Sequence, residues 1–452
     1  MKENYVGDYK KQQNKEEKEE EMKKDNITFF FSFTFFVFFL ELILKKPLNS
    51  LSLLILKNLN NNGQYCELLD YILSSQSYLG KVFLIIIIIN FKSIFSGLIF
   101  VLMTEFMIFF CGFLKLIYID PRPFWEEDLV PCSCMISYGN PSIISAQTMI
   151  MYLTFYKIIS YKTTKFTRNL LIILLYLLIS VISIASFLQN INSLNQILFG
   201  ICLSYSFYFL IFNVLQIDTE AIFIFRTLIK KQKIIELILY LLGIYIIANL
   251  VHYSYEISHN HNEDYSEEWY VKILKYCTYI PYIFFDSVSY HSVIFLPISI
   301  LISIYLEYSF IFSNNYNKFI CYNSDNKLSM KWNNTSILLT IIRMSFTFVI
   351  VYFINYFCYI GDINNDSFFK LIFFRYILMN SLIGLFVFFI GKILFMYLHL
   401  TNNAIFDKNN EFFFMNYESL YLEKVEEGKN NEQQRKREVI NNEEEENEYF
   451  NK

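Results

Sequence analysis

Charged residues are scarce in this sequence, and small residues are scarcer. Only 18% of the 452 residues are charged, whereas soluble domains are normally about one-quarter charged. Glycine occurs 12 times and alanine five times, which excludes a collagen-like chain. Eight cysteines in a chain of this length exclude a small disulfide-dense fold. A net charge of −4 also argues against a basic nucleic-acid binder.

Apolar residues are correspondingly abundant. The chain is 54% hydrophobic and 19% aromatic, and its mean hydropathy is +0.34. Disordered chains are poor in aromatics. The apolar residues gather into runs near the length of a membrane-spanning helix, without the alternation of barrel strands. We therefore predict an all-α, polytopic helical membrane protein with about ten spans (nine to eleven). The predicted spans are 28–44, 81–92, 97–118, 142–160, 166–188, 194–215, 234–254, 288–313, 337–360 and 368–400.

Composition divides the chain into five segments. The two ends are charged and low in complexity, which is typical of disordered tails. The predicted order is a charged cytosolic tail (1–27), an extra helix with a non-cytosolic segment (28–79), a membrane core (80–216), additional transmembrane helices (217–400) and an acidic cytosolic tail (401–452).

Lysine and arginine concentrate in alternate loops. The turn 157–168 and the loops near 218–233 and 314–336 are basic, so they are expected to face the cytosol. The loops 119–141 and 255–271 then lie on the lumenal or extracellular side. With an even number of spans both tails are cytosolic. We expect a multi-pass protein of an endomembrane such as the endoplasmic reticulum, or of the plasma membrane.

Two cysteines lie in the loop 119–141, where disulfides can persist. Cys132 and Cys134 are two residues apart and would bridge each other only with difficulty. Cys66 and Cys277 are possible partners on the same side; free thiols are the alternative.

Three blocks of polar residues are expected on the same lumenal or extracellular side. Lys115 and Arg122 stand seven apart at the end of one span, and Arg presents a planar fork of donors suited to phosphate. The second block, 138–145, places Pro and Ser at a helix start, where free N–H groups favour anions. The third, 185–197, joins two spans. Each block alone is also explained by snorkelling or capping.

Their order, spacing and side together resemble the type-2 phosphatidic acid phosphatase superfamily, which includes glucose-6-phosphatases and vanadium haloperoxidases. The family's first motif, K-x6-R-P, is matched in full by Lys115, Arg122 and Pro123. The second, P-S-G-H, is matched by Pro141 and Ser142 only. The resemblance covers roughly 80–216 and implies a six-helix phosphatase-like core.

The third motif, S-R-x5-H-x3-D, ends in Gln in the glucose-6-phosphatase branch. Alignment on the tail of this motif places Ala185 at its Ser, Ser186 at its Arg, Asn192 at its His and Gln196 at its last position. In the family this His attacks phosphorus and forms a phosphohistidine, and the second-motif His protonates the leaving oxygen.

Both of those histidines are missing here. Asn192 stands at the nucleophile position and has no basic lone pair, and Ile144 stands at the general-acid position and has no proton to give. Gln196 keeps the orienting position.

The resemblance also implies how phosphate is held. Lys115, Arg122 and Ser142 match the family's phosphate-binding residues, whereas Ser186 replaces a second guanidinium. We therefore expect a catalytically impaired relative of lipid-phosphate or sugar-phosphate phosphatases, which at most binds phosphate or a phospholipid headgroup. Membrane lipids are the expected partners; no metal, cofactor or nucleic acid is expected.

Two alternatives remain open. One is an active phosphatase that uses atypical residues. The other is a transporter-like or scaffolding protein, for which charged residues within the spans, such as Glu105 and Arg343, would be the first to examine.

Overall fold

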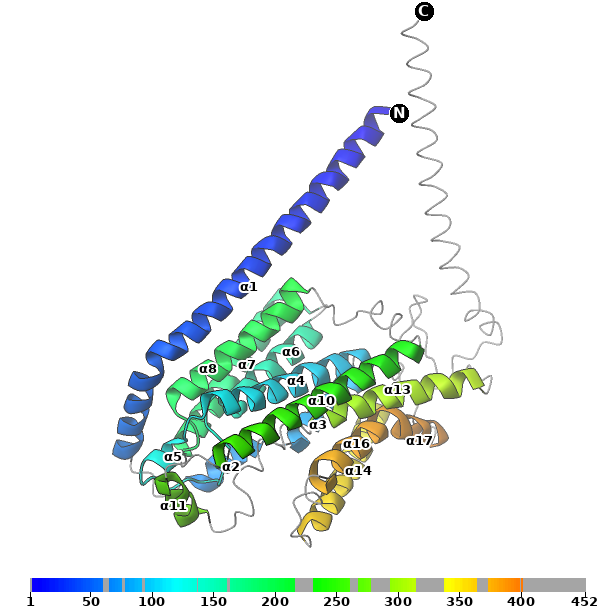
Figure 1. Cartoon of the computed structure of the whole chain (residues 1–452). Helices are drawn as coiled ribbons and strands as arrows, with labels where there is room; N and C mark the ends of the chain where they lie inside the picture. Colours follow the sequence, from blue (N-terminus) through cyan, green and yellow to red (C-terminus); the bar gives the residue numbers. More distant parts are fainter. Residues whose placement is uncertain are drawn as a thin grey trace, which may run out of the picture.

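The computed structural model is a bundle of α-helices with short π-helical turns, and the described residues contain no strand (Figure 1). These residues are 2–59, 65–74, 78–91, 94–135, 137–160, 163–215, 231–260, 267–277, 293–313, 337–363, 373–398 and 400. The predicted tail 401–452 lies outside them.

The first half of the chain forms one long helix and a compact group behind it. Its elements are α1 (Lys2–Leu59), α2 (Cys66–Ser74), α3 (Tyr78–Phe91), α4 (Ile94–Tyr118), α5 (Pro123–Glu126), α6 (Ile143–Ser160), α7 (Lys165–Leu188), α8 (Leu194–Phe209) and the π-helical turn η1 (Leu210–Val214).

The helix α1 extends beyond both ends of the predicted span 28–44. It begins at Lys2, within the charged segment 1–27. The sequence there repeats Glu and Lys four residues apart, as at Glu19 and Lys23, and that spacing favours a helix. The helix also continues through Pro47 to Leu59.

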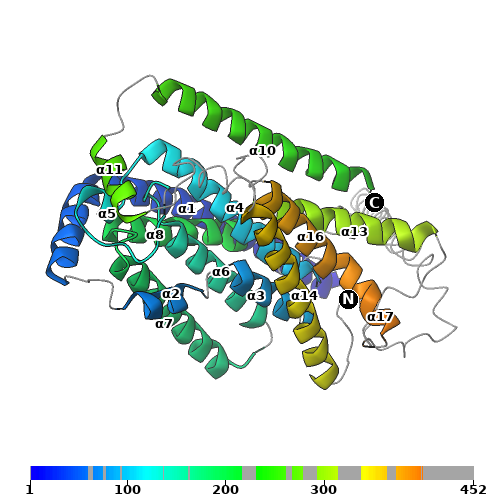
Figure 2. The same ribbon diagram turned by 90° about the horizontal axis from the view of Figure 1, so that it is seen from below.

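The second half adds α10 (Lys231–Asn260), α11 (Glu267–Tyr276), α13 (Phe295–Ser313), α14 (Ile337–Ile363), η3 (Phe373–Leu378), α16 (Met379–Leu385), η4 (Phe386–Ile390) and α17 (Gly391–Tyr397). The elements from η3 to α17 follow one another directly, with π-helical turns between the α-helices. In Figure 2, α10 lies at the edge of the bundle and α14 crosses its other end.

Seven helices are long and apolar enough to cross a membrane, counted over the part of the chain that the structure describes. Three shorter apolar helices accompany them, and each predicted span overlaps one of these ten. The long ones are Lys24–Leu59, Ser96–Glu126, Ile143–Ser160, Lys165–Leu188, Leu194–Val214, Ile234–Val251 and Ile337–Cys358; the shorter ones are Leu79–Phe91, Phe295–Leu306 and Met379–Phe395. The prediction of a polytopic helical membrane protein is confirmed.

The helix α6 is the centre of the first half, because it packs against α4, α7 and α8. The helix α1 lies along α8, as Figure 1 shows. The helix α13 contacts α4 and α16 and so joins the two halves. One apolar cluster runs through α3, α4, α6, α13 and α16. The polar motif residues lie at one end of the bundle, near α5, where α4 ends and where α6 and α8 begin.

Candidate functional site

The two cations of the first motif lie at the end of α4 and the start of α5. Lys115 and Arg122 are each only 1% exposed. The Lys115 ammonium donates to the carbonyl oxygen of Tyr138 and, at 3.4 Å, to Ser137 Oγ. Arg122 stands before Pro123, and proline is well suited to a helix start, so the turn α5 fixes where the guanidinium emerges.

The Arg122 guanidinium joins the first motif to the third. Its Nη1 donates to Asn192 Oδ1 at 3.2 Å and to the carbonyl oxygen of Ile191 at 2.9 Å. Its other nitrogens donate to Ser137, with Nε 2.6 Å from the carbonyl oxygen and Nη2 2.8 Å from Oγ. Nη2 also lies 3.3 Å from the carbonyl oxygen of Tyr138. The fork therefore clamps two loops that are far apart in the sequence.

Gln196 connects all three motifs. Its side-chain oxygen caps α8 by accepting from the Ser193 backbone N–H at 3.1 Å. Its side-chain nitrogen Nε2 donates to the carbonyl oxygen of Pro121 at 2.8 Å. Its backbone carbonyl oxygen accepts from the Ser142 backbone N–H at 3.0 Å. The residue at the family's orienting position thus fixes the relative positions of the motif backbones.

The second motif is pressed against α8. Ser142 is fully buried, and its hydroxyl donates to Ser145 Oγ at 3.2 Å, within the first turn of α6. A Cβ added at Gly200 would lie 2.6 Å from the Ser142 carbonyl oxygen, so only glycine allows this approach. The close contact holds the start of α6 beside the third motif.

Two sequence-predicted residues have their contacts elsewhere. Ser186 is fully buried, but its hydroxyl donates to the Ser183 carbonyl oxygen of its own helix at 2.8 Å. Ile144 is half-buried and packs against the apolar cluster of α3, α4 and α6. The Ser186 hydroxyl is therefore used within its own helix, and Ile144 has no polar group that could bind phosphate or move a proton.

The helix α1 adds charged groups that the sequence reasoning missed. Glu41 Oε1 accepts from Asn140 Nδ2 at 2.6 Å and from Asn195 Nδ2 at 3.4 Å. The same Asn140 nitrogen donates to Asp120 Oδ2 at 2.8 Å, and Asp120 forms an ion pair with Lys45. A Glu inside the apolar run 28–44 was the available signal, because a carboxylate there needs buried partners.

Ser137 and Tyr138 were also missed as contacts of the cations. Tyr138 belongs to the second block, but nothing in its spacing shows that its carbonyl oxygen reaches Lys115. Such acceptors are backbone groups, which every residue has. Their part in the site is visible only in the fold.

The loop before these residues contains Cys132 and Cys134, and each of them forms a disulfide. Cys66 is bonded to Cys132, and Cys134 is bonded to Cys277. The sequence left disulfides to Cys66 or Cys277 and free thiols as open alternatives, and the structure has the two disulfides.

One donor in the site has no partner in the described structure. Asn192 is 1% exposed, its Oδ1 accepts from Arg122, and its Nδ2 makes no hydrogen bond. A buried unpaired donor costs about 1–3 kcal/mol, and an acceptor bound beside it would remove that cost. Among the described residues, no group of three His, Cys, Asp or Glu side chains could hold a metal ion.

Residues 96–220 match the family model of the PAP2 superfamily. This segment is a PAP2 superfamily domain. The match extends from α4 past η1, so it contains all three motif blocks, and it confirms the resemblance that those blocks carry. No curated protein and no solved structure gives a significant match to the chain. The helices α1 and α10 to α17 lie outside the matched segment.

Proposed function

We propose that this membrane protein binds an oxyanion of the phosphate monoester class at its PAP2 site and does not hydrolyse it. The binding groups are Lys115 and Arg122 of the first motif, Ser142 of the second and Asn192 of the third. The ligand is a phospholipid headgroup or a small phosphate ester, and it binds on the non-cytosolic side of the membrane.

The observation that carries this proposal is the state of Asn192. Its side-chain nitrogen Nδ2 is buried and makes no hydrogen bond, while Oδ1 of the same side chain accepts from Arg122. Arg122 in turn donates to neutral carbonyl and hydroxyl oxygens of Ser137, which an oxyanion could replace with stronger, charge-assisted bonds. The local donors therefore favour a negatively charged acceptor.

The absence of hydrolysis follows from the same residues. An amide nitrogen is delocalised into its carbonyl and is no nucleophile toward phosphorus, so Asn192 offers no route to a phosphoryl-enzyme. Ile144 supplies no proton for a leaving oxygen. General-acid catalysis alone is typically worth about 10²–10⁴ in rate, and the nucleophile is lost in addition.

The two disulfides support a position of the motif residues on the non-cytosolic side of the membrane. Both lie at the end of the bundle that carries the motifs, joining the loop after α5 to α2 and to the end of α11. Disulfides persist in the secretory lumen and outside the cell, and they are rare in the cytosol. A motif face toward the lumen or exterior agrees with the positive charges of Lys157, Lys165 and Arg168, which lie at the end of α6 and the start of α7, away from the motif ends of these helices.

The charged residues within the spans favour no second function. Glu105 pairs with Lys81, and Arg343 donates to the Leu400 carbonyl oxygen at 2.7 Å and to Thr340 Oγ1 at 3.2 Å. The Lys81–Glu105 pair joins α3 to α4, and the Leu400 contact joins α14 to the residues after α17, whereas Thr340 lies on the same helix as Arg343. Such contacts satisfy a structural role.

The test is phosphate binding by the full chain in lipid nanodiscs, measured by equilibrium dialysis with radiolabelled inorganic phosphate. We expect saturable binding, weakened roughly tenfold by Asn192→Ala, the factor of one charge-assisted hydrogen bond. The control Asn249→Ala removes an amide that donates to the Tyr245 carbonyl in α10 and should change nothing.

Competition distinguishes the two ligand sources. Discs that contain phosphatidate should displace labelled phosphate if a lipid headgroup is bound, whereas glucose 6-phosphate added in solution should displace it if a small ester is bound. Absence of binding, or binding that Asn192→Ala leaves unchanged, would contradict the proposal. Hydrolysis of either compound by the wild type would favour the active-phosphatase alternative.

A further inference from the structure

The loop between α5 and α6 supplies hydrogen-bond acceptors to both cations. We define residues 127–135 together with 137 and 138 as the strap. At its end, Ser137 accepts from Lys115 and from two nitrogens of Arg122, and the Tyr138 carbonyl oxygen accepts from both cations. An oxyanion that binds Lys115 and Arg122 must compete with these acceptors.

Two disulfides hold the strap in this position. Cys132 is bonded to Cys66 at the start of α2, and Cys134 is bonded to Cys277 directly after α11. The bonded cysteines lie 66 and 143 residues apart in sequence, so the strap is anchored to two otherwise separate parts of the chain. Such a cross-link restricts how far the strap can move from the cations.

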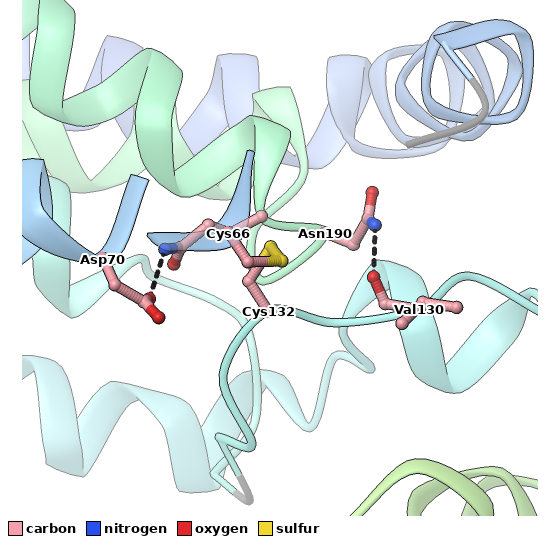
Figure 3. The surroundings of a disulfide bond; sticks show 6 residues. Cys66, Asp70, Val130, Cys132 and Asn190 are labelled. Atoms are coloured by element: carbon pink, nitrogen blue, oxygen red, sulfur yellow. Dashed lines mark hydrogen bonds between the residues drawn. A yellow bond between two sulfur atoms is a disulfide. The ribbon is translucent and has the colours of Figure 1, made fainter. Parts of the chain in front are cut away.

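Hydrogen bonds reinforce the first anchor, as Figure 3 shows. Asn190 of the third-motif loop donates to the Val130 carbonyl oxygen at 2.7 Å, beside the disulfide between Cys66 and Cys132. The Cys132 backbone N–H donates to the Gln189 carbonyl oxygen at 3.4 Å. The strap thus also rests on the loop that presents Asn192.

An exposed polar contact with α11 accompanies the second anchor, the disulfide between Cys134 and Cys277. Asp128 accepts from Lys275 at 2.6 Å and from the Tyr276 hydroxyl. These hydrogen bonds, Lys275 first, hold the pKa of Asp128 below its usual value. Exposed pairs of this kind contribute little. On this side the strap is therefore held by the Cys134–Cys277 bond and by the packing of Leu129 and Tyr138 with the apolar cluster that contains Ile273 of α11.

We infer that the strap is a disulfide-held lid on the PAP2 site, and that reduction of its two disulfides opens the site to the oxyanion. This inference rests on the proposed function, because it concerns access to the same ligand. Each disulfide takes up two electrons and two protons from a dithiol reductant, which becomes a cyclic disulfide, and leaves two thiols. With the cross-links gone, no covalent bond ties the strap to α2 or α11. Its hydrogen bonds and the packing of Tyr138 against Trp125 then oppose the movement of Ser137 and Tyr138 away from the cations.

The experiment compares phosphate binding by the full chain in nanodiscs before and after treatment with dithiothreitol, which is uncharged and does not mimic phosphate. We expect the reduced wild type to bind radiolabelled phosphate roughly tenfold more tightly, because the ligand no longer displaces held acceptors. The double variant Cys132→Ser/Cys134→Ser should show the tighter binding without reductant. The control Cys202→Ser replaces a free cysteine of α8 and should bind like the oxidised wild type.

A second variant avoids any dependence on the disulfides for folding. Ser137→Ala removes a hydroxyl that accepts from Arg122 but leaves both disulfides intact, so the oxidised variant should bind phosphate more tightly than the oxidised wild type. Equal or weaker binding in all three opened forms would overturn the lid. In that case phosphate binding by the oxidised wild type would still support the proposed function, whereas no binding in any form would overturn both.

Discussion

Replacing Arg122 with lysine tests whether its guanidinium fork holds the motif loops together. All three nitrogens of the Arg122 guanidinium donate hydrogen bonds, and their acceptors include Ser137, Tyr138, Ile191 and Asn192. Lysine keeps the charge but has a single nitrogen, which cannot reach acceptors on both loops at once. We expect the lysine of Arg122→Lys to remain beside Ser137, so the two acceptors on the other loop, the Ile191 carbonyl oxygen and Asn192 Oδ1, lose the Arg122 donor.

The magnitude follows from those acceptors. A buried acceptor without a donor costs about 1–3 kcal/mol, so two of them cost about 2–6 kcal/mol of the free energy of unfolding. The side chain is 1% exposed, so bulk water does not replace the lost donors. The assay is equilibrium unfolding in mixed micelles, followed by far-ultraviolet circular dichroism as the mole fraction of denaturing detergent rises.

The matched control is Arg168→Lys, at the exposed start of α7. A surface substitution of this kind should stay within about 0.5 kcal/mol of the wild type. If Arg122→Lys lowers the free energy of unfolding by no more than the control does, the fork does not tie the motif loops and our description of the site is wrong.

Two other substitutions test the packing around the site. Gly200→Ala should destabilise the protein by about 1–3 kcal/mol, because the new Cβ meets a backbone oxygen of Ser142, whereas Gly243→Ala, with nothing within 4 Å of its Cβ, should be neutral in the same unfolding assay. Lys81→Met should cost about 3–5 kcal/mol because it leaves Glu105 charged and buried. The double variant Lys81→Met/Glu105→Gln should recover most of that loss, and no recovery would show that the pair is not coupled.

The helical class and the resemblance to the PAP2 superfamily could be predicted from sequence because they depend on local patterns. Apolar runs of membrane-spanning length identify spans without any knowledge of how they pack. The first motif needs only the spacing from Lys115 to Arg122, and the structure places both on one site with Asn192. Cys66 and Cys277 could be named as partners because the expected topology put them on the side of Cys132 and Cys134.

The contacts within the site could not be predicted in the same way. The acceptors of Lys115 and Arg122 are largely backbone oxygens of Ser137 and Tyr138, and backbone groups carry no sequence signature. The contribution of Glu41 depends on α1 lying against α8, which is a packing choice between helices of similar apolar composition. The helical start of α1 was missed because a charged, low-complexity sequence fits both a disordered tail and a helix.

The central claim is that the PAP2 site binds phosphate without breaking a phosphate ester. Its most direct test is release of inorganic phosphate from phosphatidate, sphingoid phosphate and glucose 6-phosphate by the purified full chain, compared with Asn192→Ala prepared in the same way. We predict no release above background from either protein, oxidised or reduced. Turnover by the wild type that Asn192→Ala abolishes would contradict the claim and assign Asn192 a part in catalysis.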